Sequence, residues 1–455
     1  MKIIYGVQQP DAGEIVWEGA PVVIKDPDAA RARGIGMVFQ HFSLFETLTV
    51  AENIALGLAS PEPLAALTGR IAAMAARYGL AVDPGRHVHH LSVGERQRVE
   101  ILRCLLQAPK LLIMDEPTSV LTPQEVEGLF AMLRRLAAEG CSVLYISHKL
   151  AEIRALCDGA TVLRAGRVVG HCDPRTTSAL QMAEMMIGQA LAAPPPRARV
   201  APGADVLVAA GLSLPAEDPF GTALRDVAFA VRGGEILGIA GIAGNGQKEL
   251  LAALTGERLA PRAENVRIAG VPVGRQGAAA RRRAGLAAVP EERLGRSAVA
   301  ELSLTENALL TGTDGIFAAR GFVRFALLRR FARGVIDAFK VVAAGEAALA
   351  GSLSGGNMQK FIIGREVGHA PKVLIAAHPT WGVDVGAAQA IHEALRDLAA
   401  GGVGVLIMSE DLDEVLSLCD RVAVLHGGGL SPPRPVAAVT VDAIGLLMGG
   451  MADAA

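Results

Sequence analysis

The fold is decided by the stretch Leu112-Ile113-Met114-Asp115-Glu116-Pro117-Thr118, which returns 262 residues later as Leu374-Ile375-Ala376-Ala377-His378-Pro379-Thr380. The same offset separates Leu91-Ser92-Val93-Gly94-Glu95-Arg96-Gln97 from Leu353-Ser354-Gly355-Gly356-Asn357-Met358-Gln359, and Ser147 from Ser409. A repeat of this length corresponds to two whole domains and not to a solenoid of short units.

Composition argues against several classes of protein. The 455 residues suffice for two or three domains with full cores. Lys and Arg number 44 against 46 Asp and Glu, so the net charge of −2 disfavours a nucleic-acid partner. The five cysteines form no CxxC pair, which suits buried thiols in a reducing cytosol. Mean hydropathy is +0.36, but we find no apolar run of about 18 residues and predict no membrane span.

The chain divides at a proline-rich stretch, residues 192–204. We therefore predict domains at 1–191 and 206–455 with a linker at 192–205. In each half, short apolar runs that end in polar residues alternate with helical patterns. The runs are residues 110–115, 142–147, 373–377 and 403–409, and the helices are residues 123–139 and 386–400. This pattern predicts a largely parallel sheet with helices on both faces, whose ligands bind beyond the carboxyl ends of the strands.

Residues 234–251 have the pattern of a strand, a glycine-rich turn and a helix start. Gly241 and Gly246 stand where a phosphate-binding loop places its glycines, with Gly244 and Asn245 between them. Gln247 takes the lysine position and Lys248 the hydroxyl position, so this loop lacks the lysine charge and the Mg²⁺ hydroxyl ligand. A glycine turn used only for packing is the alternative interpretation.

The pair Asp115-Glu116 ends an apolar strand and is followed, after a helix and a strand, by Ser147-His148. Asp115 can hold Mg²⁺, Glu116 can polarise an attacking water, and His148 can orient that water. Taken alone, the acid pair also fits a solvated loop and the histidine a packed or surface residue. The matching positions of the second half are Ala377, His378 and Glu410, so that half has no evident general base.

Both Leu-Ser-x-Gly segments precede a predicted helix, where a hydroxyl and backbone amides at a positive helix end suit an anion. The candidates are Ser92 and Gly94 in the first copy and Ser354, Gly355, Gly356 and Gln359 in the second. A single copy would more often be a turn. The histidines just before the first copy, His87, His89 and His90, fit a polar loop better than a metal site, because no carboxylate or thiol stands at ligand spacing.

Together these residues resemble an ATP-binding subunit of an ABC transporter over essentially the whole chain. Gln40 matches the Q-loop, Ser92 to Gln97 the signature, Asp115-Glu116 the Walker B pair and His148 the H-loop. The resemblance implies two tandem P-loop NTPase domains of α/β class, each with a parallel-sheet core and antiparallel β and helical subdomains. The second half is similar to the degenerate domain of duplicated sugar and nucleoside importers, and Gly244 to Gln247 lean toward the nucleoside branch.

The resemblance also implies how ATP and Mg²⁺ are bound. The two halves pair with each other, and each ATP lies between one phosphate loop and the opposite signature. One site would combine Gln40, Asp115, Glu116 and His148 with Ser354, Gly355, Gly356 and Gln359, with Asp115 and Gln40 toward the metal. The other site would combine the loop residues Gly241, Gly244, Asn245, Gly246, Gln247 and Lys248 with Ser92 and Gly94. In this site Val93 replaces a glycine at a place where ATP must approach closely.

The opening element of the first copy is absent from the chain. Aligning Gly6 with Gly256 makes residues 1–5 the remainder of the helix that follows a phosphate loop, and residues 206–250 have no counterpart in the first half. We expect that Met1 is an internal methionine of a longer product. The chain that starts at Met1 is expected to bind ATP poorly and to hydrolyse it hardly at all, because the phosphate loop of its first half is missing. The first sheet also lacks a central strand, which is a liability for solubility.

The resemblance favours a peripheral ATPase on the cytoplasmic face of the cell membrane that drives import of a nucleoside or simple sugar, with membrane-spanning permease subunits and a substrate-binding protein as partners. Residues 42–56 and 294–310 would dock on the permease. Two alternatives stay open: a soluble duplicated ATPase acting on ribosomes or DNA, and an inactive truncated product. The short proline-rich linker and the single acid pair argue against the first of these.

Overall fold

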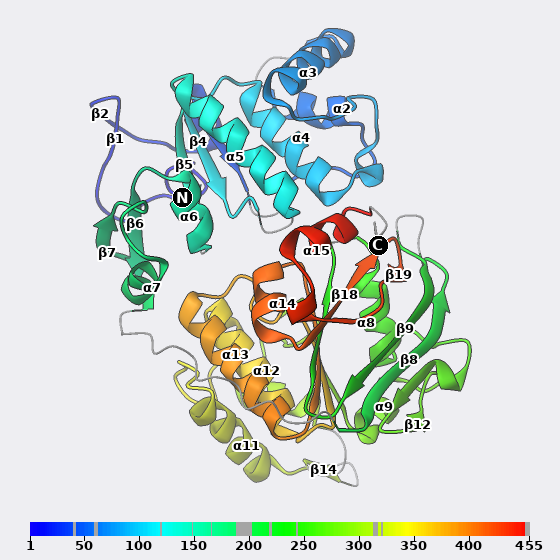
Figure 1. The fold of residues 1–455 in the computed structure, drawn as a ribbon. Coiled ribbons are helices and arrows are strands. Elements are labelled where there is room, and N and C mark those ends of the chain that lie inside the picture. The colour runs from blue at the N-terminus through cyan, green and yellow to red at the C-terminus, as the bar shows by residue number, and fades with distance from the viewer. Residues whose placement is uncertain are drawn as a thin grey trace. The chain divides into compact units, whose positions relative to one another are not determined.

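The computed structural model describes residues 1–39, 42–58, 62–118, 121–147, 149–164, 166–187, 203–217, 221–242, 244–312, 317–319 and 322–450. The chain forms two compact units, Met1–Leu191 and Ala192–Ala455, each with its own sheets and helices (Figure 1). Most of the predicted linker, 192–205, lies outside the described residues, and β8 begins at its last position, Asp205.

Unit 1 is built on a three-stranded parallel sheet, β3-β4-β5, with two antiparallel hairpins, β1-β2 and β6-β7. Its strands are β1 (Ile15–Trp17), β2 (Ala20–Val22), β3 (Ile35–Val38), β4 (Leu111–Asp115), β5 (Ser142–Ile146), β6 (Ala160–Arg164) and β7 (Arg167–Cys172). Its helices are α1 (Pro27–Ala32), α2 (Val50–Leu56), α3 (Leu64–Tyr78), α4 (Val93–Leu105), α5 (Pro123–Ala138), α6 (Leu150–Leu156) and α7 (Ala179–Ile187).

Unit 2 has a large mixed sheet in the order β13-β16-β17-β10-β18-β19, with β20 also paired to β18, and a smaller antiparallel sheet in the order β12-β11-β8-β9. Its strands are β8 (Asp205–Leu214), β9 (Leu224–Arg232), β10 (Ile236–Ala240), β11 (Val266–Ile268), β12 (Val271–Pro272), β13 (Leu286–Val289), β14 (Ala318–Ala319), β15 (Phe322–Val323), β16 (Val373–Ala377), β17 (Gly404–Ser409), β18 (Arg421–His426), β19 (Gly429–Leu430) and β20 (Arg434–Pro435). Its helices are α8 (Gln247–Thr255), α9 (Ala278–Ala284), α10 (Leu304–Leu309), α11 (Phe325–Ala338), α12 (Gly355–Gly368), α13 (Val385–Ala400), α14 (Leu412–Leu418) and α15 (Val441–Met448).

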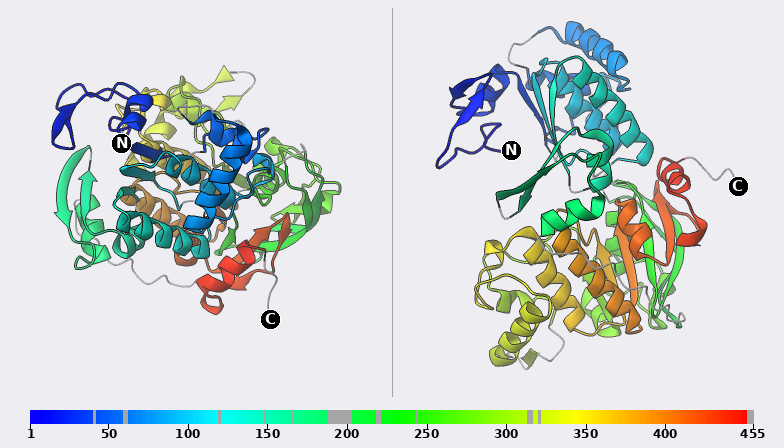
Figure 2. Two further views of the ribbon diagram at one scale, coloured as in Figure 1. Left: turned by 90° about the horizontal axis from the view of Figure 1, so that it is seen from above. Right: turned by 60° about the vertical axis from the view of Figure 1, so that its left-hand side comes forward.

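The large sheet of unit 2 separates two hydrophobic cores because side chains alternate between its faces. Along β17, Val405 and Ile407 face one core and Leu406 and Met408 the other. The first core is closed by helices that include α12 and α13, and the second by α8 and the antiparallel sheet (Figures 1 and 2). The predicted parallel core is confirmed. Antiparallel strands share the second face with α8, in agreement with the antiparallel β subdomain that the resemblance implies.

The helices that the sequence predicted begin at polar caps. Thr122 starts α5 and forms a capping box with Glu125, and Asp384 starts α13 by accepting from the backbone of Ala387. Predicted and observed bounds agree within a residue or two for both helices and for β4, β5, β16 and β17.

The strands β5 and β17 are counterparts in the repeat, but their surroundings differ. β17 lies between β16 and β10 and every residue in it is buried. β5 pairs with β4, and among the described residues it has no second neighbour, so none of its five residues is fully buried. β6, the counterpart of β18, pairs only with β7 within the described part of the chain. Within the described residues, unit 1 thus has no strand at the place that β10 fills in unit 2.

The first residues of the chain form a hydrogen-bonded turn that matches the end of α8. Gly6 has a φ of +79° and Gly256, the C-cap of α8, a φ of +85°. The N–H of Gln8 donates to the carbonyl of Lys2 at 3.2 Å, and the N–H of Arg258 to that of Ala252 at 3.0 Å. All three pairs of positions are 250 residues apart, which supports the alignment of Gly6 with Gly256.

Candidate functional site

The acid pair of unit 1 sits at a left-handed turn directly after β4. Asp115 ends the strand, and Glu116 has a φ of +47° while its N–H donates to the carbonyl of Ile146 at 2.9 Å. In unit 2 His378 has the same φ and donates to the carbonyl of Met408 at 2.8 Å. Non-glycine residues are uncommon in this conformation, and functional sites are among the places where it is retained. His378 therefore occupies the backbone position of Glu116.

A buried glutamate in each unit fixes the loop that carries this turn, and the sequence analysis missed both. Glu152 of α6 is 8% exposed and accepts hydrogen bonds from the hydroxyls of Thr118 at 2.6 Å, Tyr145 at 2.6 Å and Ser147 at 3.1 Å. Burial, and then the neighbouring carboxylate, raise the pKa of Tyr145, so its hydroxyl remains a donor. Glu152 thus ties the segment after Glu116 to the end of β5.

The same arrangement recurs in unit 2. Glu414 is 5% exposed and accepts from the hydroxyls of Thr380 at 2.5 Å and Ser409 at 2.6 Å, while the His392 ring lies 3.1 Å away. Glu152 and Glu414 are themselves 262 residues apart, and each lies five residues after the serine of the repeat. That shared spacing was the available signal for finding them.

The glycine-rich loop of unit 2 connects β10 to α8 and is braced by its own side chains. Gly244 and Gly246 have φ values of +85° and +111°. The amide of Gln247 donates to the carbonyl of Ile242 at 2.8 Å and accepts from the N–H of Asn245 at 3.1 Å. One loop amide that could face a phosphate is therefore already taken by Gln247.

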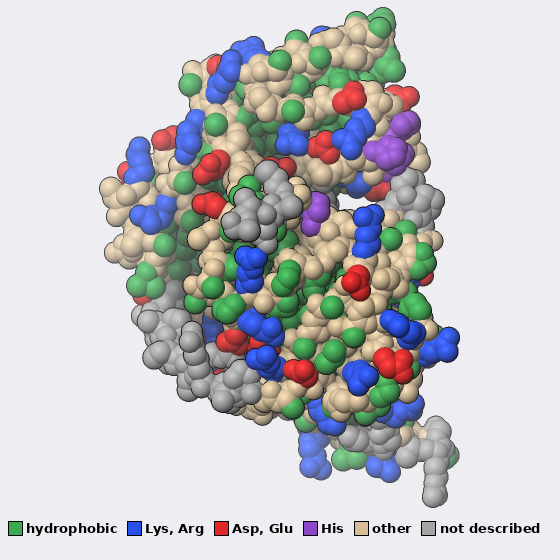
Figure 3. All heavy atoms as spheres, turned by 45° about the vertical axis from the view of Figure 1, so that its right-hand side comes forward, with side chains coloured by type: hydrophobic (Ala, Val, Ile, Leu, Met, Phe, Trp, Pro, Cys, Tyr) green, Lys and Arg blue, Asp and Glu red, His purple; other side chains and the backbone are tan. Residues whose placement is uncertain are grey.

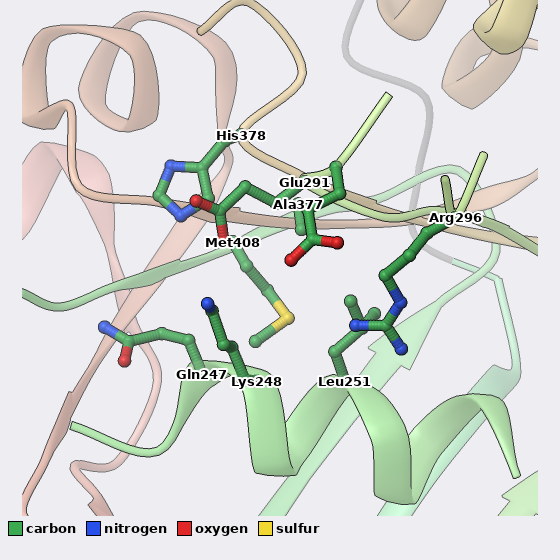
Figure 4. A pocket seen from close by; sticks show the side chains of 9 residues that line it. Gln247, Lys248, Leu251, Glu291, Arg296, Ala377, His378 and Met408 are labelled. Carbon is green, nitrogen blue, oxygen red and sulfur yellow. The ribbon is translucent and has the colours of Figure 1, made fainter. Parts of the chain in front are cut away.

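A pocket opens between this loop and the strand ends of the large sheet (Figure 4). Gln247 and Lys248 come from the start of α8, while Glu291 and His378 lie opposite them in Figure 4. The complete lining is Gln247, Lys248, Leu251, Glu291, Glu292, Arg296, Ala377, His378 and Met408. Burial lowers the pKa of His378, although Glu291 and Glu414 oppose that shift. The structure thus brings the predicted residues Gln247 and Lys248 together with His378.

Each signature serine is the N-cap of a helix. Ser92 starts α4 and forms a capping box with Glu95, and a Cβ at Gly94 would collide with the Glu125 carboxylate. Ser354 starts α12 and accepts from the Asn357 amide at 2.9 Å.

The residues after Ser354 are closely packed inside unit 2. Gly355 lies against the Arg293 guanidinium, and Gly356 against the side chains of Asp384 and Ala387. Gln359 is 1% exposed and accepts from Arg293 at 3.1 Å. Gln359 is thus held within unit 2, and its contact with a nucleotide stays a prediction.

Three predicted side chains lie outside what the structure describes. Gln40 and His148 lie outside the described residues, and nothing is described of the side chain of Val93. Within the described ranges, no three His, Cys, Asp or Glu side chains form a group that could hold a metal ion. His87, His89 and His90 lie ring to ring, and His87 and His89 contact the carbonyls of Thr47 and Glu46. Mg²⁺ at Asp115 stays a prediction.

Surface charge is mixed. On the face drawn in Figure 3, basic and acidic side chains are interspersed, as the net charge of −2 leads one to expect. None of the described helices combines the length and the hydropathy needed to cross a bilayer.

Comparison with known proteins identifies the family. Residues 1–119 and 224–381 match the family described as ABC transporter. The chain belongs to the ABC transporter family. It is 39% identical over 490 residues to the glucose import ATP-binding protein TsgD13 of Haloferax volcanii, covering all of this chain and 88% of that protein. It is 37% identical to the nucleoside import ATP-binding protein NupA of Lactococcus lactis, covering 99% of this chain and 90% of NupA. The resemblance drawn from the motifs is confirmed.

Solved structures support the fold. An archaeal ribosome recycling factor, aABCE1 in complex with the stalk protein aP1, is similar with a TM-score of 0.60 at 19% identity, covering 91% of this chain and 76% of that chain. This likeness concerns the fold alone, because folds are shared by proteins of different function. The predicted α/β P-loop fold is confirmed.

Proposed function

We propose that this ABC transporter family protein is the ATP-hydrolysing subunit that energises import of a nucleoside or simple sugar. The relatives that span nearly the whole chain are import ATP-binding proteins for glucose, nucleosides, guanosine and ribose. The observation that carries the proposal is the acid pair on its left-handed turn, held by Glu152 at the carboxyl end of a parallel sheet. The protein acts at the cytoplasmic face of the membrane beside permease subunits.

The proposed reaction uses unit 1 for the chemistry. Glu116 polarises the attacking water, His148 orients it, and the carboxylate of Asp115 suits Mg²⁺, which when bound neutralises charge on the transferred phosphate. The signature residues Ser354 and Gly355 of unit 2 close this site. ATP binding brings the halves together, and hydrolysis separates them.

The second composite site, formed by the unit 2 loop and the Ser92 signature, is proposed to bind nucleotide without hydrolysing it. Ala377 replaces the metal carboxylate and His378 replaces the glutamate, although the backbone turn is the same. Each time the two halves close, one ATP would then be hydrolysed, at the site that contains Glu116.

Exposed apolar side chains lie in the segments proposed to dock on the permease. In unit 1 Phe45 is 61% exposed and Leu56 64%, and in unit 2 Leu294 and Leu310 are exposed as well. Apolar side chains that are exposed on the free subunit and rimmed by polar residues suit contact with a protein partner. These segments follow β3 and β13, so ligand at the strand ends could move them.

Replacing Glu116 tests the proposal. In the protein as its cells make it, complexed with permease and binding protein, Glu116→Gln should lower ATP turnover and substrate uptake at least about 10²-fold, because the general base is lost while the side-chain shape is kept. Phosphate release measures ATP turnover, and uptake of substrate into proteoliposomes measures transport.

The matched control is Glu127→Gln, an exposed glutamate of α5 in the same unit. It should leave both rates unchanged. ATP turnover that survives Glu116→Gln at the wild-type rate would refute the assignment of hydrolysis to unit 1.

A further inference from the structure

The pocket of unit 2 lacks two of the donors that usually hold a magnesium ion at a phosphate-binding loop. A Mg²⁺-dependent phosphate site uses a hydroxyl at the start of the helix and a carboxylate at the strand end. Here Lys248 stands at the hydroxyl position and Ala377 at the carboxylate position. An ammonium repels a divalent cation and offers it no lone pair. Two of the usual Mg²⁺ donors are therefore missing from this pocket, and the Lys248 ammonium repels the metal from the carboxylates of Glu291 and Glu292 that remain in its lining.

Lys248 supplies a positive charge to the same place. Its side chain is exposed, comes from the first turn of α8 and lines the pocket (Figure 4). Arg296, the other cation of the lining, is paired with Glu257. Lys248 forms no ion pair with any described residue. It is therefore available to a ligand that carries negative charge.

The groups around Lys248 support this role. Glu291 stands two residues after β13, as Gln40 stands two residues after β3, and it lies across the pocket from α8. His378 does not compete for an anion, because burial lowers its pKa and keeps the imidazole neutral near pH 7. The amide of Gln247 is occupied within the loop. Lys248 is thus the cation that remains between the loop and Glu291.

We propose that the loop of unit 2 binds the phosphates of a nucleoside triphosphate without Mg²⁺, the Lys248 ammonium taking the place of the metal between phosphate oxygens and the Glu291 carboxylate. Charge-assisted hydrogen bonds from an ammonium to phosphate are strong and need no metal. The inference rests on the proposed function, in which this loop receives nucleotide. It adds that nucleotide binding at this second site does not need a metal ion.

Titration calorimetry of the whole chain with ATP tests the proposal. In excess EDTA, ATP should bind with an affinity within about twofold of that measured with Mg²⁺, and Lys248→Ala should weaken this metal-free binding at least about tenfold. Lys372→Ala is the matched control: it removes an exposed lysine just before β16, at the opposite end of that strand from Ala377, and should change nothing. Absence of ATP binding in EDTA, or equal binding by Lys248→Ala, overturns the inference.

A second variant rebuilds the metal site. Lys248→Thr combined with Ala377→Asp supplies the missing hydroxyl and carboxylate, and ATP binding should become at least about tenfold tighter with Mg²⁺ than with EDTA. Binding that stays indifferent to the metal would overturn the inference.

Failure here is distinct from failure of the proposed function. The proposed function is decided by Glu116-dependent turnover in unit 1. Normal uptake together with metal-dependent binding at the unit 2 loop would refute the inference on Lys248 and leave the proposed function intact.

Discussion

Glu152 and Glu414 each join two loops of their unit through one buried carboxylate. In both units the carboxylate accepts from the threonine that follows the repeated proline and from the serine at the carboxyl end of the next strand, which directly follows β5 in unit 1 and is the last residue of β17 in unit 2. Buried carboxylates are retained when hydrogen bonds satisfy them, and removal of one partner leaves an unsatisfied group. Through these hydrogen bonds the two residues position the turns at residues 116 and 378.

The hydrogen bonds to Glu414 make the stability of unit 2 depend on pH. Burial raises the pKa of Glu414, but hydrogen bonds from His392, Ser409 and Thr380 outweigh burial and hold it below the ordinary value. A carboxyl whose pKa is lowered by folding contributes stability above its unfolded pKa, about 4.3, and loses it as pH falls through the folded pKa. Glu414→Gln should cost about 2 kcal/mol at pH 7, and much less near pH 3.

Thermal unfolding at both pH values measures this difference. Glu393→Gln, on the exposed side of α13, is the control and should shift the melting temperature equally little at pH 7 and pH 3. An equal loss at both pH values for Glu414→Gln would show that the carboxylate is not charged in the folded protein.

At the scale of elements, the neighbours of a strand decide how well its backbone is protected. The N–H of Val405 in β17 donates to the carbonyl of Glu235 at 2.8 Å, on the side of β10. Its counterpart Val143 in β5 has no such strand beside it among the described residues. Alternate amides of a parallel strand point to opposite sides, so those of Val143 and Tyr145 face the open edge of the sheet.

Hydrogen exchange should report this asymmetry. The amides of Val143 and Tyr145 should exchange at least about tenfold faster than those of Val405 and Ile407, because unpaired edge groups open at lower free energy. Amide-resolved NMR or mass spectrometry gives the rates, and Leu144, whose partner strand β4 is present, serves as the internal reference. Equal protection of Val143 and Val405 would mean that another segment covers the edge of β5.

The sequence predicted the elements whose pattern is local. The apolar runs at residues 110–115 and 373–377 became β4 and β16, and Thr122 with Glu125 marked the start of α5. Contacts between distant residues were not predictable in this way. The Thr118–Glu152 hydrogen bond spans 34 residues, and the amide of Gln247 folds into its own loop. Such contacts depend on tertiary packing, which hydrophobic periodicity does not encode.

At the scale of the whole chain, the two units differ in the size of their main sheets and in how deeply the strands are buried. In the part of the chain that the structure describes, the large sheet of unit 2 has seven strands, whereas the parallel sheet of unit 1 has three. Many of the residues in β10, β16 and β17 are 0% exposed, while β5 remains partly exposed throughout. Because burial of apolar surface is the main source of stability, unit 2 should be the more stable of the two.

The two tryptophans allow each unit to be followed separately. Trp17 lies in β1 of unit 1 and Trp381 follows β16 in unit 2. In Trp381→Phe the remaining Trp17 reports on unit 1, and in Trp17→Phe the remaining Trp381 reports on unit 2. The fluorescence of Trp381→Phe should change at the lower temperature, because unit 1 is expected to be the less stable unit. Circular dichroism on both variants controls for effects of the substitutions. A single shared transition would show that the units unfold together.

The left-handed turn shared by Glu116 and His378 has an evolutionary consequence. Since the two turns have the same φ and the same strand hydrogen bond, a carboxylate or an imidazole can be exchanged there without any rebuilding of the main chain. Under the proposed function, a duplicated ancestor could thus have silenced hydrolysis in one half by side-chain replacement alone, so specialisation of the two halves required few genetic steps.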